Sequence, residues 1–181
     1  FFTADQHLGH DKIRLYCKRP FSTKEEMNQV IISNWNNVVG NNDTVYVLGD
    51  FAFGNAEQIE SYVQQLKGNI VFICGNHDKS LFAWAKSKGK QIFQNYMAKA
   101  EGEEFFLSHY AHRVWNKSHY GVIHLYGHSH GGLPDLDLSM DVGVDVNNFT
   151  PVAASEIIKK MLPIREQLLK EGKIFKSRKE D

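Results

Sequence analysis

The stretch on which the fold depends is Ile70-Val71-Phe72-Ile73-Cys74-Gly75-Asn76-His77-Asp78. Its first half is a short β-branched and aromatic run, which is typical of a strand that is buried on both faces of a sheet. In open α/β sheets, ligands sit just beyond the carboxyl ends of such strands. The sequence therefore places Asn76 and His77 where a binding or catalytic site is expected.

The same arrangement, an apolar run followed by polar side chains, occurs at four other places in the chain. The runs are residues 1–4, 45–49, 105–108 and 122–127, and the polar residues that follow them are Asp5, His7, Asp50, His109, His128 and His130. A single Asp or His after a strand is more often a turn residue than a ligand. Five such strand ends in a chain of 181 residues indicate one shared site.

The length and composition fit a single domain over residues 1–181, with 42% hydrophobic residues to form a core. The 21 basic residues balance the 21 acidic ones, so stable binding to duplex nucleic acid is not expected. No apolar run approaches the ~20 residues of a membrane helix. Because Cys17 and Cys74 suggest no disulfide framework, we expect a cytoplasmic protein that does not bind membranes.

The segments between the strands have the pattern of helices that cover a sheet. Capping signals and apolar spacing predict helices at about 22–39, 55–67, 80–88 and 154–170. A strand is expected at about 91–98, and the turn at 101–104 leads into the next strand as in a hairpin. The charged tail at 173–181 is expected to be frayed.

Alternation of apolar and polar residues predicts a further strand over 140–146. Asp141 and Asp145 lie on it. They could support metal-bound histidines from behind, but the half-exposed pattern favours an interpretation as surface carboxylates.

The polar residues at the strand ends have the chemistry of metal ligands. Asp, His and Asn without Cys form a nitrogen and oxygen set that suits Mn, Fe, Zn or Ni. Seven candidates are too many for one ion, but they fill two sites if one carboxylate bridges. Two metals ~3.5–4 Å apart can hold both the attacking and the leaving oxygen of a phosphoryl displacement. The seven candidates are Asp5, His7, Asp50, Asn76, His109, His128 and His130.

The order of these motifs resembles that of the calcineurin-like metallophosphoesterases, and most of all the short bacterial and phage phosphohydrolases without a large cap domain. The motifs that carry the resemblance are Asp5-x-His7, Gly49-Asp50, Gly75-Asn76-His77-Asp78, His109 and Gly127-His128-Ser129-His130. The resemblance implies a two-sheet α/β sandwich flanked by helices. It also implies a metal-dependent phosphoric ester hydrolase with two divalent metal ions per chain, for which Mn is the first expectation and Fe, Zn or Ni are alternatives.

The resemblance assigns each motif residue a role. The first metal would be bound by Asp5, His7 and His130, the second by Asn76, His109 and His128, and Asp50 would bridge. A hydroxide that bridges the two ions would attack the phosphorus in line. His77 would contact a phosphate oxygen and protonate the leaving group, while Asp78 would orient its imidazole ring.

The substrate pocket is the least determined part of the site. Because binding groups usually sit on loops, the candidates are His10, Arg14, Arg19, His112 and Arg113. The first three lie in a basic stretch at 8–20, which either binds a substrate phosphate or is an ordinary solvated segment. We expect a phosphodiesterase for a nucleotide-like or other small phosphoester. A single-strand nuclease, a phosphomonoesterase and a non-catalytic metal-binding scaffold stay open as alternatives.

Overall fold

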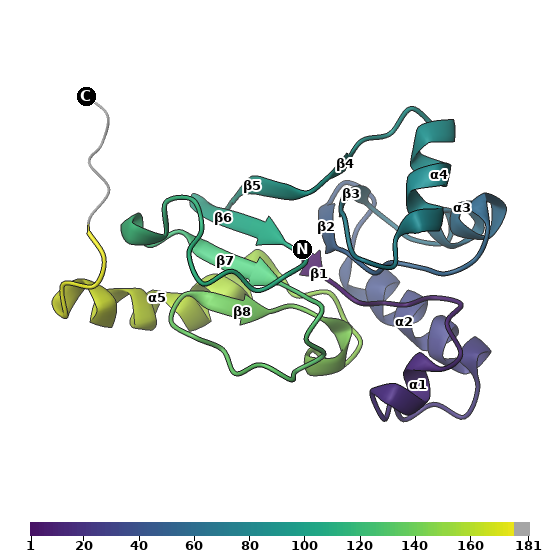
Figure 1. Cartoon of the computed structure of the whole chain (residues 1–181), viewed down its shortest axis with the longest axis horizontal. Coiled ribbons are helices and arrows are strands. Elements are labelled where there is room, and N and C mark those ends of the chain that lie inside the picture. The colour runs from purple at the N-terminus through teal and green to yellow at the C-terminus, as the bar shows by residue number, and fades with distance from the viewer. Residues whose placement is uncertain (176–181) are drawn as a thin grey trace.

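The first of two four-stranded sheets is built by the N-terminal half of the chain, in a computed structural model that describes residues 1–175. Its strands are all parallel and lie in the order β1 (Phe2–Thr3), β2 (Thr44–Leu48), β3 (Asn69–Ile73) and β4 (Ile92–Phe93). The helices between them are α1 (Ile13–Tyr16), α2 (Lys24–Val38), α3 (Ala56–Gln64) and α4 (Lys79–Ser87). These helices gather at the end of the molecule that holds the first sheet (Figure 1).

The second sheet follows in chain order as β5 (Asn95–Ala100), β6 (Glu103–Ser108), β7 (Ile123–Tyr126) and β8 (Ser139–Asp141). β5 and β6 form an antiparallel hairpin, and the other two pairs are parallel. Two short 3-10 helices, η1 (Ser118–Tyr120) and η2 (Val144–Val146), lie in the connections. The last helix, α5 (Ala154–Lys170), lies along this sheet (Figure 1).

Two of the helices begin at residues whose side chains cap the first turn. In α2, the Thr23 hydroxyl accepts a hydrogen bond of 3.1 Å from the backbone N–H of Glu26. In α3, Asn55 and Gln58 form a reciprocal capping box, with both hydrogen bonds at 2.9 Å. Side-chain caps of this kind satisfy backbone N–H groups that the first helical turn leaves without partners.

The core follows from the alternation of side chains along the strands. In β2, Val45 and Val47 pack with the helices of the first sheet, and Leu48 belongs to the cluster shared with the second sheet. Phe2 of β1 contacts Phe105 of β6 with ring centroids 4.9 Å apart. β1 therefore lies where the two sheets meet, which places the residues that follow it between them.

The two-sheet α/β prediction is confirmed, and two expected strands differ. The run at 91–98 is divided into β4 and β5, which belong to different sheets, because the chain crosses between the sheets at this point. The run at 140–146 ends as a strand at Asp141 and turns into η2. Of the tail, Ile174 is buried against the second sheet's core, and residues 176–181 lie outside the described part. None of the helices within residues 1–175 is long and apolar enough to cross a membrane.

Candidate metal centre

The predicted ligands from the two sheets meet at one place. β1, β2 and β3 are parallel, so their carboxyl ends lie at one edge of the first sheet, and β6 and β7 run parallel in the second. Ligand-type atoms of Asp5 and His7 lie within 4.8 Å of those of His130, which follows β7. We call these three residues the buried cluster, because Asp5 and His7 are 0% and 2% exposed.

A second group of ligand atoms lies beside the first. Atoms of Asp50, His109 and His128 lie within 4.8 Å of one another. Asn76 joins them, since its Oδ1 lies 2.9 Å from Nε2 of His109. We call Asn76, His109 and His128 the open cluster, because the side chains of Asn76 and His128 are exposed to solvent.

Asp50 lies between the two clusters. Its Oδ2 is 3.6 Å from Nε2 of His7, in the buried cluster, and 3.6 Å from Nε2 of His109, in the open cluster. Its other oxygen, Oδ1, accepts a hydrogen bond of 2.9 Å from the backbone N–H of His77. One carboxylate oxygen thus faces both clusters while the other is held by the backbone.

The backbone at these positions is unusual. Asp5, His7, Asp50, His128 and His130 all have positive φ, at 59°, 51°, 53°, 67° and 47°. Such left-handed conformations are uncommon outside glycine, and each costs on the order of 1–3 kcal/mol unless the surroundings compensate. Five of them at one place bend the chain sharply after β1, β2 and β7, where the candidate ligands of these strands lie.

Two motif glycines make room for the ligands. Gly49 has φ of +89°, and a Cβ atom there would collide with Nδ1 of His109 and approach Cα of Gly75 to 2.7 Å. A Cβ atom on Gly75 would collide with Oδ1 of Asp50. The glycines of both motifs are therefore needed for the close approach of backbone and ligand.

The buried cluster has the chemistry of a cation site. Oδ1 of Asp5 and both ring nitrogens of His7 are buried without a hydrogen-bond partner, which is rare for buried polar atoms. Burial, and then the nearby carboxylates of Asp50 and Asp141, raise the pKa of Asp5 well above its usual value. Burial, and then His130, lower the pKa of His7 to about 2, so its ring is neutral and offers a lone pair. Acids and neutral imidazoles that lack partners fit a divalent metal ion.

Asp145 and Arg19 support the buried cluster from behind. Oδ2 of Asp145 lies 2.6 Å from Nδ1 of His130 and accepts a hydrogen bond of 2.8 Å from Nη2 of Arg19. Nη2 of Arg19 also donates to the carbonyl of Asp5 at 2.7 Å. Although burial raises the pKa of Asp145, the hydrogen bonds from His130 and Arg19 hold it below its usual value. A carboxylate that fixes a ligand histidine in this way is typical of metal sites.

These contacts correct two expectations. Asp141 and Asp145 are not surface carboxylates. Asp141 is 4% exposed, and its oxygens accept hydrogen bonds from Ser129 Oγ at 2.6 Å and from the backbone N–H of Gly143 at 2.7 Å. Arg19, expected to bind substrate, is 5% exposed and paired with Asp145. The sequence contained one indication that Asp141 and Asp145 are buried. Residues 140–146 are mostly apolar, and an acid can be buried in such a segment when it has hydrogen-bond partners.

Asp78 and His77 have separate environments, although they are neighbours in the chain. Asp78 is 1% exposed, and its oxygens accept backbone hydrogen bonds from Asp50 at 2.9 Å, Phe51 at 2.9 Å and Gly75 at 2.7 Å. It therefore joins the turns after β2 and β3 instead of orienting the ring of His77, as expected. The His77 side chain is exposed and lines the cavity over the clusters.

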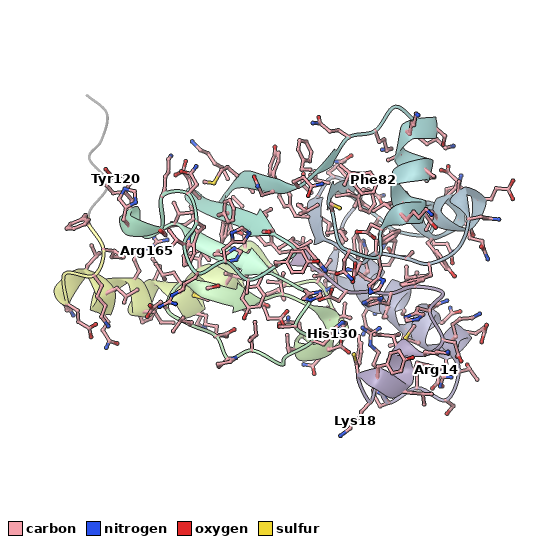
Figure 2. All side chains as sticks on the ribbon, viewed as in Figure 1. Arg14, Lys18, Phe82, Tyr120, His130 and Arg165 are labelled. Atoms are coloured by element: carbon pink, nitrogen blue, oxygen red, sulfur yellow. The ribbon has the colours of Figure 1, made fainter. Side chains whose placement is uncertain are left out.

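That cavity has a volume of about 450 Å³. Its metal-facing side is formed by His7, Asp50, His77, His128 and His130. The rest of its lining is formed by His10, Ile13, Tyr16, Cys17 and Phe53. Figure 2 shows that His130 lies on the side of the second sheet that faces the α1 segment, where Arg14 and Lys18 are labelled.

Of the five expected substrate residues, the structure brings only His10 to the cavity. The guanidinium of Arg14 donates to Asp11 and to the carbonyls of Phe21 and Ser22, so it holds its own loop together. His112 lies 3.0 Å from Ser108 Oγ through its Nε2 and packs on Phe106. Arg113 lines a different cavity, beside α5.

The comparison with known families agrees with this geometry. The sequence model of the family described as calcineurin-like phosphoesterase matches residues 1–178. The chain belongs to the calcineurin-like phosphoesterase family. It is accordingly a metallophosphoesterase, and the hydrolase activity expected from the motifs is supported.

Two similar sequences and one similar solved structure come from three different sources. The uncharacterized protein MJ1445 of Methanocaldococcus jannaschii is 34% identical over 186 residues, which cover 98% of this chain and 94% of that protein. The gene 66 protein of Mycobacterium phage L5 is 33% identical over 81 residues, or 43% of this chain and 39% of that protein. The crystal structure of AQ665, a protein of unknown function from Aquifex aeolicus, superposes with a TM-score of 0.68 at 23% identity. The superposition covers 88% of this chain and 97% of the AQ665 chain, and it shows that the two share a fold.

Proposed function

We propose that this phosphoesterase holds two divalent metal ions, with Mn as the first candidate, and hydrolyses small phosphodiesters. The buried cluster would hold one ion and the open cluster the other, with Asp50 shared between them. The observation that carries the proposal is the position of Asp50 Oδ2, at 3.6 Å from a ring nitrogen of each cluster. An oxygen in that position can serve two cations at once.

The metal ions supply a defined part of the chemistry. When bound, two cations lower the pKa of water to near neutrality and neutralise charge on the phosphoryl oxygens. The chain contributes the geometry. Asp145 fixes the ring of His130 through Nδ1, and Asp78 fixes the backbone of Asp50. The candidate metal ligands His130 and Asp50 are therefore held in position before substrate enters.

His77 is proposed as the general acid. Its ring lines the cavity, 5.8 Å from the ring of His7 between centroids, and its backbone N–H is bound to Asp50. Hydroxide derived from water forms a new P–O bond, and the bond to the leaving oxygen breaks with its electron pair on that oxygen. A proton from His77 then converts the leaving group to a neutral alcohol. A monoester and an alcohol are the products of the diester and one water.

The cavity lining favours a diester over a monoester. A monoester carries a second negative charge, which proteins commonly neutralise with Arg or Lys. In the described part of the chain, no Arg or Lys lines the cavity, because Arg19 is paired with Asp145 and Arg14 with Asp11. The same lining argues against a nuclease for single strands, which needs a positive groove along the backbone. A small diester, nucleotide-like or otherwise, is the substrate class proposed.

Two free cysteines are consistent with action in the cytoplasm.

The test is hydrolysis of bis(p-nitrophenyl) phosphate and p-nitrophenyl phosphate side by side. Metal-stripped protein receives Mn, Ni, Zn or Mg, and the Asp50→Asn variant serves as the control for contaminating phosphatases. We expect metal-dependent release of nitrophenol from the diester in preference to the monoester. Preference for the monoester would overturn the substrate class. Inactivity of protein that contains two ions would favour a non-catalytic scaffold.

A further inference from the structure

The side of the cavity that faces α1 carries a row of aromatic rings. His10 and Phe53 are stacked, with ring centroids 4.2 Å apart and planes inclined by 13°. At one end of this pair, the ring of His77 lies 5.5 Å from that of Phe53. At the other end, the ring of Tyr16 lies 6.5 Å from that of His10. The row therefore runs from the proposed general acid to the outer part of the cavity.

The outermost ring has no structural task that explains its position. Tyr16 is 69% exposed, and none of the hydrogen bonds found among residues 1–175 involves its hydroxyl. Leu15, the residue before it in α1, is also 69% exposed but does not line the cavity. An exposed aromatic ring contributes little to folding stability, whereas a ring beside a binding cavity can stack on a planar ligand.

From this row we infer that the site selects phosphoesters whose organic group is planar and aromatic, such as a nucleobase or an aryl ring, and that Tyr16 determines this preference. The inference rests on the proposed function only for the position of the phosphoryl group beside the two clusters. The organic group then extends over Phe53 and His10 toward Tyr16. Aromatic side chains bind planar organic groups well, because ring faces stack on each other without requiring a particular base.

The test measures binding, so that it does not depend on turnover. Metal-loaded protein is titrated by calorimetry with methyl(phenyl)phosphinate, methyl(cyclohexyl)phosphinate and dimethylphosphinate, which carry one negative charge as a diester does and whose C–P bonds are not hydrolysed by a phosphoesterase. The three probes share one charged group and differ in the size and planarity of the substituent. We expect the phenyl probe to bind ~10-fold more tightly than the dimethyl probe and about threefold more tightly than the cyclohexyl probe, within the range for stacked aromatic groups.

Variants at Tyr16 separate stacking from burial of apolar surface. Tyr16→Ala should reduce the preference for phenyl over methyl to about threefold or less, because stacking on Phe53 and His10 alone is left. Tyr16→Leu should retain a preference for both larger probes over methyl but lose the distinction between phenyl and cyclohexyl. Leu15→Ala, which changes an equally exposed neighbour outside the cavity, should leave all three affinities within error of wild type.

Two results would overturn the inference. One is equal affinity of the wild-type protein for phenyl and cyclohexyl probes, which would indicate an apolar site without preference for a plane. The other is a phenyl preference that Tyr16→Ala and Tyr16→Leu leave unchanged. Failure of the proposed function would be separate, since it would be seen as absent hydrolysis of diesters by protein that still binds these probes.

Discussion

The buried and the open cluster offer similar ligand atoms in different surroundings. In the buried cluster, Asp5 and His7 are almost inaccessible, and His130 is fixed by Asp145 and Arg19. In the open cluster, Asn76 and His128 are exposed, and only His109 is buried. Two sites in one centre can therefore have different duties. Under the proposed function, the enclosed cluster would hold its ion firmly, while the exposed cluster would leave room for a substrate oxygen.

The largest effect is expected from the residue that the clusters share. Asp50→Asn keeps the size of the side chain but removes the charge that faces both His7 and His109. We expect both ions to bind more weakly and turnover to fall by ~10³-fold or more, since two-metal stabilisation contributes several kcal/mol. Metal content by mass spectrometry and diester hydrolysis are the measurements. Retention of two tightly bound ions would contradict a shared role for Asp50.

His77 belongs to neither cluster, so its removal separates proton transfer from metal binding. His77→Ala should leave the metal content near that of wild type and lower turnover by ~10²–10⁴-fold. The loss should be larger for an alkyl leaving group than for p-nitrophenol, because a poor leaving group depends more on protonation. A uniform loss over leaving groups, or loss of metal, would show that His77 is not the acid.

The support behind His130 gives a smaller and more local effect. Asp145→Asn should lower the affinity for one ion, at the buried cluster, by ~10–100-fold and leave the other ion's affinity near wild type. Competition with a fluorescent chelator measures both affinities. Asp135→Asn is the matched control, because this exposed carboxylate in the loop before β8 pairs with Lys160 at the surface and accepts a hydrogen bond from a backbone N–H. An equal loss at both sites would contradict the separation of the clusters.

The turn that carries His109 in the open cluster depends on a buried histidine with no ligand role. His124 is 0% exposed. Its Nε2 accepts the backbone N–H of His112 at 2.9 Å, and its Nδ1 lies 3.1 Å from the carbonyl of Phe106. Burial lowers the pKa of His124 from the ordinary 6.5 to about 4 in the folded protein.

Because the unfolded chain binds the proton more readily, the stability that neutral His124 contributes is complete above pH 6.5 and is lost as the pH falls toward 4. The largest contribution is roughly 3 kcal/mol, since a pKa difference of one between the folded and unfolded chain is equivalent to about 1.36 kcal/mol. The free energy of unfolding, measured with urea at about pH 7, 5.5 and 4.5, tests this dependence, because the contribution of His124 is complete at the first value and is lost over the range that holds the other two. His124→Gln should have a flatter dependence over that range, and a slope equal to that of wild type would assign the acid sensitivity to other groups.

The parts of the site that the sequence predicted are those with local signals. Each candidate ligand lies shortly after a strand, and Gly49 and Gly75 mark the close turns, so Asp50 and Asn76 can be proposed as ligands from the sequence alone. The two sheets and their helices follow from the same alternation. The capping signal at the start of the helix predicted at 22–39 also agrees with the structure, where Thr23 caps α2.

The parts that the sequence did not predict depend on residues far apart in the chain. Arg19 and Asp145 are 126 positions apart, and a basic residue in a polar loop gives no sign that it will be buried against an acid. Asp78 was assigned to its neighbour His77, but its partners are backbone groups of Asp50 and Phe51, 28 and 27 positions away. Contacts of this kind are set by the packing of the two sheets and have no periodic signature.

The proposed dinuclear centre has two ions on either side of one carboxylate oxygen. Anomalous diffraction from crystals soaked in Mn²⁺ tests it most directly, because each ion gives its own peak. We expect two peaks, one among Asp5, His7 and His130 and the other among Asn76, His109 and His128, with Asp50 Oδ2 between them. A single peak at saturating Mn²⁺, or two peaks that do not share Asp50, would contradict it.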